Sequence, residues 1–547
     1  MGSSVGARRY GKRERGDAVI RSTSVRLLVS IGGAVLMLSV APAASAGTFG
    51  ASPPLDITAG DPYSACPPIG AGTNYPDAEV EPFVGVNPTN PLNILAVYQQ
   101  DRYSNGGSKG IVSSRSIDGG LNWLQVAVPA DTVCTGGKYD RASDPWITFG
   151  RDGVAHAMSL VTDADPPAGF GDNGMAYNRS TDGGLTWEPA QLLIEDTDPR
   201  FLNDKNSMTA DPNDADFVYA VWDRLQNAKA DTKLGPAENR VGLGFKGPIY
   251  FTRTTNGGDS WEPARKIWES GANKQALGDQ IGVLPSAEGG DLLDFFTEFV
   301  NASDRAGHFP RWLSFIRSTN KGASWGQEER VDIEFPGSIL AGRNGDSTID
   351  VEAFPCPDTT EQGSCPIRSG DFIPDIAVDP NNGNIYAVWM DLRFDGGIAL
   401  VDHDNIAFTM STDGGRTWSP TIKVNQTPPT EPNYDQQAFT PSVAVAANGT
   451  VTVSYYDFRH NTPDPASLLT DYFAVHCHSA CANPASWMGN ETQITPTPFD
   501  IRKAPYARGY FLGDYMGLDT AGNDFLSVFG QAFAQNDSNQ YVSRIGP

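Results

Sequence analysis

The sequence predicts an all-β protein made of repeated small sheets, and three features of the chain favour this fold class. The 547 residues include 58 glycines and 40 prolines, which are typical of turns. Hydrophobic residues make up 39% of the chain and aromatic residues 10%, enough for a large core. Few long apolar stretches occur, so short strands joined by turns fit the pattern better than helices do.

Five eight-residue segments share one turn pattern: a hydroxyl residue, any residue, Asp or Asn, Gly or Lys, Gly, two further residues, and Trp. In such a turn the acid or amide bonds its own backbone, glycine adopts a positive φ, and tryptophan packs back onto the sheet. We therefore predict a hairpin turn at each of the five segments. They are 116–123, 180–187, 254–261, 318–325 and 411–418, with Asp118, Asp182, Asn256, Asn320 and Asp413 at the third position.

Two further motifs recur upstream of these turns. The nearer one is an apolar strand ending in an aromatic residue, an acid and an arginine, with Arg102, Arg224, Arg393 and Arg459 as the arginines. The farther one is a polar start followed by a short apolar strand and a turn. The acids at these polar starts are Glu79, Glu81, Asp144, Asp279, Asp375 and Asp514, the last of which precedes Tyr515.

Together the motifs define seven units, each expected to form a four-stranded antiparallel sheet. Radial repetition of such sheets is the β-propeller, for which we expect seven blades, with six as the alternative. The last unit lacks a fourth strand, and residues near Leu55 are expected to supply it. In the sixth unit a link between Cys477 and Cys481 is expected to replace the usual turn. The predicted organisation is a signal peptide at 1–46, a lead with the ring-closing strand at 47–76, and the propeller at 77–547.

The first 46 residues read as a targeting segment. A basic start is followed by an apolar run from Leu27 to Val40 and the small-residue site Ala44-Ser-Ala46. The apolar run is shorter than the roughly 20 residues that a spanning helix needs, which disfavours a membrane anchor. We therefore expect a secreted protein, cleaved near Ala46 and without a membrane span.

The six cysteines all lie after the predicted cleavage site, and an even count in an exported chain indicates disulfides. The expected pairs are Cys356 with Cys365, Cys477 with Cys481, and Cys66 with Cys134. We expect no cofactor or bound metal. Ca²⁺ at one of the Asp- and Asn-rich turns is the alternative, although none of them has the spacing of an EF-hand loop. The formal net charge of −25 disfavours nucleic acid as a partner.

Strand order places the motifs at opposite ends of the sheets. If the five tryptophan-bearing turns join third and fourth strands at one end, the acid–arginine pairs and the polar starts fall at the other. Independent motifs thus converge on one rim around a central channel. This convergence predicts the functional face.

The five turns resemble the Asp-box (BNR) repeats of the sialidase-superfamily propellers, and the resemblance covers nearly the whole chain after residue 46. In such propellers these turns join third and fourth strands on the face opposite the active site. The resemblance therefore implies a structural role for Asp118, Asp182, Asn256, Asn320 and Asp413. In sialidases an arginine triad holds the substrate carboxylate, a Tyr–Glu pair is the nucleophile, and an Asp is the acid/base. The resemblance therefore implies that Tyr515, Asp514, Asp144 and Glu81 are catalytic, with Tyr456 as another possible nucleophile. It also implies that the substrate is bound by Arg102, Arg224, Arg393 and Arg459. The alternative interpretation of the acid–arginine pairs is structural, with repeated ion pairs joining adjacent blades.

The leading hypothesis is a secreted, monomeric, exo-α-sialidase-like retaining glycosidase that acts on a carbohydrate. The first repeat lacks the Arg-Ile-Pro segment of sialidases, and two alternatives stay open: a non-catalytic propeller that binds glycan or protein, and a polysaccharide lyase. A glycosidase needs carboxyl or Tyr groups within about 5–10 Å of one another, flanking one sugar. A binding module needs exposed aromatic residues instead.

Overall fold

The structure is a computed structural model, and the residues that it describes lie within the segment Gly47–Pro547. Within it the described residues are 49–547 except 59, 167–168, 228–245, 272–273, 301–310, 335–347, 353–363, 372, 396–402, 430–435, 463 and 465, and only the backbone is described at 348–352, 364–366 and 395. The predicted signal peptide at 1–46 lies outside the described residues. In the described part of the chain, no helix has the length and apolar character needed to cross a membrane.

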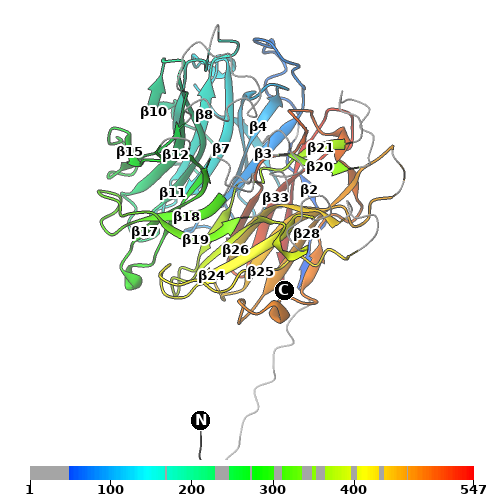
Figure 1. The fold of residues 1–547 in the computed structure, drawn as a ribbon. Coiled ribbons are helices and arrows are strands. Elements are labelled where there is room, and N and C mark those ends of the chain that lie inside the picture. Colours follow the sequence, from blue (N-terminus) through cyan, green and yellow to red (C-terminus); the bar gives the residue numbers. More distant parts are fainter. Residues whose placement is uncertain are drawn as a thin grey trace, which may run out of the picture. The chain divides into compact units, whose positions relative to one another are not determined.

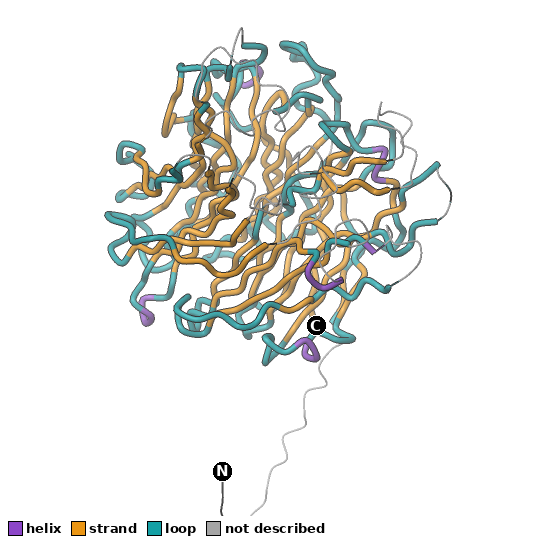
Figure 2. Tube along the Cα trace, in the orientation of Figure 1, coloured by secondary structure: helices purple, strands orange, loops and turns teal. Residues whose placement is uncertain are grey.

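The described residues are all-β, with strands joined by loops and no α-helix (Figure 2). Short 3₁₀ turns are the helical elements. They are η1 (Val133–Thr135), η3 (Ser286–Glu288), η4 (Arg393–Asp395), η6 (Pro484–Ser486) and η7 (Ile501–Lys503). The abundance of glycine, proline and β-branched residues explains why strands and turns prevail over helices, because these residues weaken helices and suit turns and strands.

Most described strands fall into seven antiparallel groups that follow one another along the chain. Group one is β3 (Glu79–Val86), β4 (Ile94–Arg102), β5 (Ser108–Ser116) and β6 (Leu124–Ala127). Group two is β7 (Arg141–Phe149), β8 (Ala155–Thr162), β9 (Asn173–Ser180) and β10 (Gln191–Asp196). Group three is β11 (Phe201–Ala210), β12 (Val218–Gln226), β14 (Ile249–Thr254) and β15 (Arg265–Trp268). Group four is β16 (Lys274–Val283), β17 (Leu292–Val300), β18 (Arg311–Ser318) and β19 (Glu329–Glu334).

The remaining groups follow the same plan. Group five is β22 (Asp375–Val378), β23 (Ile385–Asp391), β24 (Asn405–Ser411) and β25 (Ile422–Lys423). Group six is β26 (Ala438–Val445), β27 (Val451–Asp457), β28 (Leu469–Cys477) and β29 (Glu491–Gln493). Group seven is β32 (Gly517–Ala521), β33 (Asp524–Gln531) and β34 (Asn539–Gly546), and the N-terminal strands β1 (Gly50–Ala51) and β2 (Leu55–Asp56) pair with β34.

The first strands of the groups contact one another in a cycle. The order of contact is β3, β7, β11, β16, β22, β26 and β32, and β32 returns to β3. Figure 1 shows β3, β7 and β11 side by side at the start of this series. A buried apolar cluster fills the space between each pair of neighbouring groups, including groups seven and one. This cyclic packing is typical of β-propellers, because each sheet can bury both of its faces only against two neighbours.

Among the described strands, five lie outside the seven groups: β13 (Lys246–Gly247), β20 (Thr348–Glu352), β21 (Ser364–Arg368), β30 (Phe499–Asp500) and β31 (Tyr510–Phe511). Strands β20, β21 and β31 form a small separate sheet, in which β21 and β31 are parallel. Its register pairs Arg368 with Phe511. This small sheet matters for the site, because it brings Arg368 close to the loop that precedes β32.

The five tryptophan-bearing turns share one hydrogen-bond pattern. In the second of them, Oδ1 of Asp182 accepts from the Ser180 hydroxyl at 2.9 Å and from the backbone N–H groups of Leu185 and Thr186 at 3.0 and 2.9 Å. Asn256 plays the same part in the third turn, where its Oδ1 accepts from the backbone of Ser260 at 3.0 Å. The turns join third to fourth strands, so they lie at the opposite end of the sheets from the starts of the first strands.

Two of the three expected disulfides are present, Cys66–Cys134 and Cys477–Cys481. The second closes the connection between β28 and β29, where Trp487 is buried and donates its indole N–H to the Cys481 carbonyl at 2.8 Å. The predicted pair of Cys356 and Cys365 lies outside the residues whose side chains are described.

We expect Asp182→Ala to lower the free energy of unfolding by about 1 kcal/mol, because several hydrogen bonds to a mostly exposed carboxylate are lost. Asp182→Asn should be close to neutral, because the chain itself uses Asn256 and Asn320 at this position. Urea unfolding of both variants measures the difference. Equal destabilisation by Ala and Asn would contradict a role for these hydrogen bonds.

Candidate functional site

A repeated backbone irregularity marks the beginning of the first strands. β3, β7, β11, β16 and β26 each carry a bulge near their start. In each bulge one residue has a positive φ: 55° at Glu81, 50° at Asp144, 48° at Lys205, 72° at Gly278 and 49° at Thr440. Glycine adopts this conformation freely, whereas other residues pay about 1–3 kcal/mol for it. Of these five bulges, that of β16 is the one with glycine at this position.

Three of these strained residues, Glu81, Asp144 and Lys205, have ionisable side chains, and these side chains meet. The ammonium nitrogen of Lys205 lies 3.5 Å from Oε1 of Glu81 and 3.6 Å from Oδ1 of Asp144. The same nitrogen lies 2.5 Å from Oδ2 of Asp514, which precedes β32. One cation therefore joins three carboxyl groups that come from groups one, two and seven.

Two arginines complete the set, which we call the charged cluster: Glu81, Arg102, Asp144, Lys205, Arg368 and Asp514. Arg368 donates from Nε to Oδ1 of Asp514 at 3.0 Å and from NH2 to Oδ2. Arg102 donates to Oε1 of Gln99 at 2.6 Å, and the Gln99 amide donates to Glu81. Both guanidinium groups lie over the ring of Phe511, at 4.9 Å for Arg102 and 4.2 Å for Arg368. No cluster member is more than 8% exposed.

The carboxyl groups of Glu81 and Asp144 differ in their affinity for protons. Burial, followed by the negative charge of Asp144, raises the pKa of Glu81 from 4.5 to about 8. Burial also acts to raise the pKa of Asp144, but Lys205 and a hydrogen bond with Glu81 outweigh it and leave that pKa below its ordinary value. At neutral pH Glu81 therefore holds a proton beside an ionised Asp144.

Asp514 is the fixed anion of the cluster. Burial acts to raise its pKa, yet Arg368 and Lys205 together hold the pKa far below the ordinary value. Burial lowers the pKa of Arg102 to about 10, which leaves it charged at neutral pH. Asp514 cannot donate a proton in this setting, so its part in the site is to hold Lys205 and Arg368 in place.

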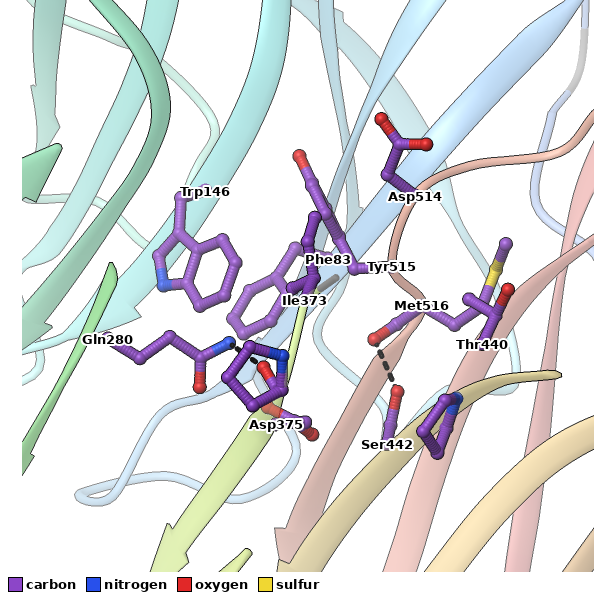
Figure 3. A pocket seen from close by; sticks show the side chains of 12 residues that line it. Phe83, Trp146, Gln280, Ile373, Asp375, Thr440, Ser442, Asp514, Tyr515 and Met516 are labelled. Atoms are coloured by element: carbon purple, nitrogen blue, oxygen red, sulfur yellow. Dashed lines mark hydrogen bonds between the residues drawn. The ribbon is translucent and has the colours of Figure 1, made fainter. Parts of the chain in front are cut away.

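Tyr515 lies next to the cluster, in an aromatic group that Figure 3 shows with Phe83 and Trp146. Its ring centroid is 5.5 Å from that of Trp146, and its hydroxyl donates to the Pro145 carbonyl at 3.0 Å. Burial, and then the charge of Glu81, raises the pKa of Tyr515 well above its usual range. The neighbouring cavity, which Asp375 and Asp514 also line, measures 10 Å³, about enough for one water molecule.

The other three predicted arginines contact carboxylates elsewhere. Arg224 binds both oxygens of Asp196 on β10, and Arg393 binds Asp332 on β19 at 2.6 Å. Arg224 on β12 and Arg393, which follows β23, are each linked in this way to the fourth strand of the preceding group. Arg459 binds Asp457 and, at 2.5 Å, Glu491 within its own group. None of these partners belongs to the charged cluster, so of the four predicted arginines only Arg102 is placed there.

The remaining sequence-based candidates also lie apart from the cluster. Glu79 accepts a hydrogen bond from Gln100 at 2.6 Å. Asp375 accepts from the backbone of Val443 at 2.7 Å. The Tyr456 hydroxyl donates to the carbonyl of Gly530 at 2.8 Å, in the core between groups six and seven. Asp279 is buried near Asp223 and Asp294, and burial raises the pKa of all three carboxyl groups.

Sequence reasoning did not identify Lys205 and Arg368. Lys205 occupies the same bulge position as Glu81 and Asp144, so aligning the polar starts residue by residue would have found it. No comparable signal exists for Arg368, which comes from the separate small sheet. No group of three or more His, Cys, Asp or Glu side chains suited to a metal ion occurs among the described residues.

No family model matches the sequence, and no curated protein matches it either. Solved structures that it resembles include a protein of unknown function from Dyadobacter fermentans, with 13% identity, a TM-score of 0.43, and coverage of 87% of this chain and 97% of that one. An α-L-arabinofuranosidase from Fusarium graminearum has 12% identity, a TM-score of 0.41, and coverage of 74% and 93%. The NanB sialidase from Streptococcus pneumoniae has 12% identity, a TM-score of 0.38, and coverage of 91% and 71%. At these values the similarities assign no activity to this chain.

We expect Lys205→Met to destabilise the fold by about 3–5 kcal/mol, because it leaves buried carboxylates without their shared cation. Adding Asp514→Asn removes one of those charges and should recover part of the loss. Urea unfolding of the single and double variants measures this coupling. A Lys205→Met protein as stable as the parent would refute the ion-pair geometry.

We expect the raised pKa of Glu81 to make the free energy of unfolding depend on pH. In the folded protein the pKa of Glu81 is about 8, whereas the ordinary value, expected in the unfolded chain, is 4.5. Between these two pH values the folded protein therefore keeps the proton of Glu81, and the unfolded chain releases it. Ionisation of Glu81 in the unfolded chain therefore lowers the free energy of unfolding of the parent as the pH rises through this window. We expect Glu81→Gln to gain stability relative to the parent between pH 5 and pH 8 in urea unfolding. A difference that does not change with pH would show that Glu81 has an ordinary pKa.

Proposed function

We propose that the chain is an exported β-propeller with seven blades, which are the seven strand groups. The cycle of contacts among the first strands supports this count, and so does the apolar cluster between every neighbouring pair. The pairing of β1 and β2 with β34 completes the last blade with the N-terminal segment. The two disulfides fit an oxidising compartment, which supports export.

We further propose that the protein is a glycoside hydrolase whose reaction takes place at the charged cluster. One observation carries this proposal: Glu81 and Asp144 contact the same lysine nitrogen, and their pKa values are shifted in opposite directions. A neutral acid beside a carboxylate is the pair that glycosidic cleavage requires. Oε1 of Glu81 and Oδ1 of Asp144 lie 3.5 and 3.6 Å from the same lysine nitrogen, so the two carboxyl groups are close enough to act on one glycosidic bond.

In this mechanism Glu81 gives its proton to the glycosidic oxygen as the bond to the anomeric carbon breaks. The carboxylate of Asp144 forms the bond to that carbon, and Lys205 keeps Asp144 ionised. Water then displaces Asp144 from the anomeric carbon and returns a proton to Glu81. Tyr515 stays a candidate nucleophile by resemblance, but its hydroxyl donates to Pro145, so the geometry favours Asp144 for this step.

Backbone strain at Glu81, Asp144 and Lys205 supports a functional role for these residues. Glu81, Asp144 and Lys205 are held at positive φ although Gly278 occupies the corresponding position without strain. Strain of this kind is found most often at functional sites.

A second candidate function is a non-catalytic propeller that binds glycan or protein. The observation that favours it is burial: every member of the cluster is at most 8% exposed, and the neighbouring cavity measures 10 Å³. In that case the cluster serves to join the blades. The two proposals differ in whether any glycoside is turned over.

The test is hydrolysis of a panel of aryl glycosides, including an α-sialoside and an α-L-arabinofuranoside, together with polysaccharides, between pH 4 and pH 9. We expect turnover that declines on the alkaline side with an apparent pKa of about 8, as Glu81 loses its proton. Glu81→Gln and Asp144→Asn should each lower kcat by at least about a hundredfold.

Glu79→Gln is the matched control, because Glu79 is a buried carboxyl on the same strand outside the charged cluster. It should keep the parent activity. No turnover of any substrate would refute the hydrolase proposal in favour of the binding module. Products with an unsaturated uronate would instead indicate a lyase.

A further inference from the structure

A second cavity lies at the opposite end of the sheets from the charged cluster. It measures 680 Å³, within the range of about 300–1,000 Å³ typical of small-molecule sites. Its walls come from groups five and six: the turn between β22 and β23, the tryptophan-bearing turn after β24, the turn between β26 and β27, and the segment after β28. We call this cavity the turn-side groove.

The walls of the groove are held rigid by local bonds. Asp379 accepts from the Asn381 backbone at 2.8 Å and from the Asn382 amide at 2.7 Å. The Asn381 amide also donates to the Ala447 carbonyl at 3.2 Å, which ties the turns of the two groups together. On the far wall, the Cys477–Cys481 disulfide closes the segment that carries His478. A groove braced in this way needs little ordering when a ligand binds.

The lining combines polar side chains with aromatic and thioether surface. Asn382, Asn384 and the exposed Thr412 supply amide and hydroxyl groups. Half-buried Trp418 and Met410 supply flat or adaptable apolar surface. Hydroxyl groups of a sugar pair with amides and hydroxyls, while the C–H faces of a sugar ring pack on aromatic side chains.

Charge narrows the ligand class further. No lysine or arginine is among the described residues that line the groove, which disfavours an anionic ligand. Asp379 is the carboxylate there, and both of its oxygens already accept hydrogen bonds from Asn381 and Asn382. A cation would therefore find no free carboxylate among the described lining residues.

We propose that the turn-side groove is a binding site for a neutral oligosaccharide. It lies at the opposite end of the strands from Glu81 and Asp144, so it acts as a separate glycan-holding site. The inference does not depend on catalysis at the charged cluster, because it rests on a different cavity with different residues.

The test is binding of the full-length mature protein to an array of neutral and anionic oligosaccharides, followed by calorimetric titration with the neutral glycan that binds best. Thr412→Tyr fills the groove from an exposed position. The matched control is Thr181→Tyr, because Thr181 is the exposed residue at the same position of another tryptophan-bearing turn, outside this groove.

We expect a neutral oligosaccharide to bind, Thr412→Tyr to weaken its binding by about tenfold or more, and Thr181→Tyr to leave it unchanged. The melting temperature and any hydrolytic activity of Thr412→Tyr should match those of the parent. Binding of anionic glycans alone, binding that Thr412→Tyr leaves intact, or no binding to the array would each overturn the proposal. If instead the hydrolase proposal is wrong, no substrate is turned over, and the result of the glycan array does not change.

Discussion

A single buried ammonium group connects distant parts of this fold. Lys205 lies within 3.6 Å of carboxyl oxygens from three strand groups, and one of them, Asp514, also binds Arg368 from the separate small sheet. Charges this deeply buried are tolerated only when each has an oppositely charged partner, because desolvation of a lone ion costs several kcal/mol. The arrangement of the first strands around the cluster therefore has little freedom to change.

That constraint also sets the proton affinities on which the proposed chemistry depends. Three carboxyl groups belong to the cluster. The nearby cations outweigh the effect of burial at Asp514 and Asp144 and lower their pKa values, whereas at Glu81 burial prevails and the pKa rises. The proton therefore resides on Glu81. The same ion pairs that join the blades would in this way prepare an acid and a carboxylate, so structural and catalytic interpretations of the cluster are compatible.

The two ends of the sheets have different chemistry. At one end, bulges aim charged side chains toward one another at the start of the first strands. At the other end, short turns rich in Asp, Asn and Trp border an open groove of 680 Å³ without lysine or arginine in its described lining. Antiparallel strand order enforces this separation, because successive connections must alternate between the two ends.

The sequence by itself determined the all-β class, the repeated turns around residues such as Asp118 and Asp182, and the expected role of Leu55 near the last strand. Each depends on local patterns, in which a few neighbouring residues fix a turn or an alternation. It also singled out Glu81, Asp144 and Asp514 as polar strand starts. Only the tertiary structure decided that these three meet at Lys205, that Arg368 joins them from β21, and that Arg224 and Arg393 bind carboxylates between neighbouring groups. The reason is physical: proximity between residues far apart in the chain is set by how the sheets pack, and burial then decides which carboxyl group keeps its proton.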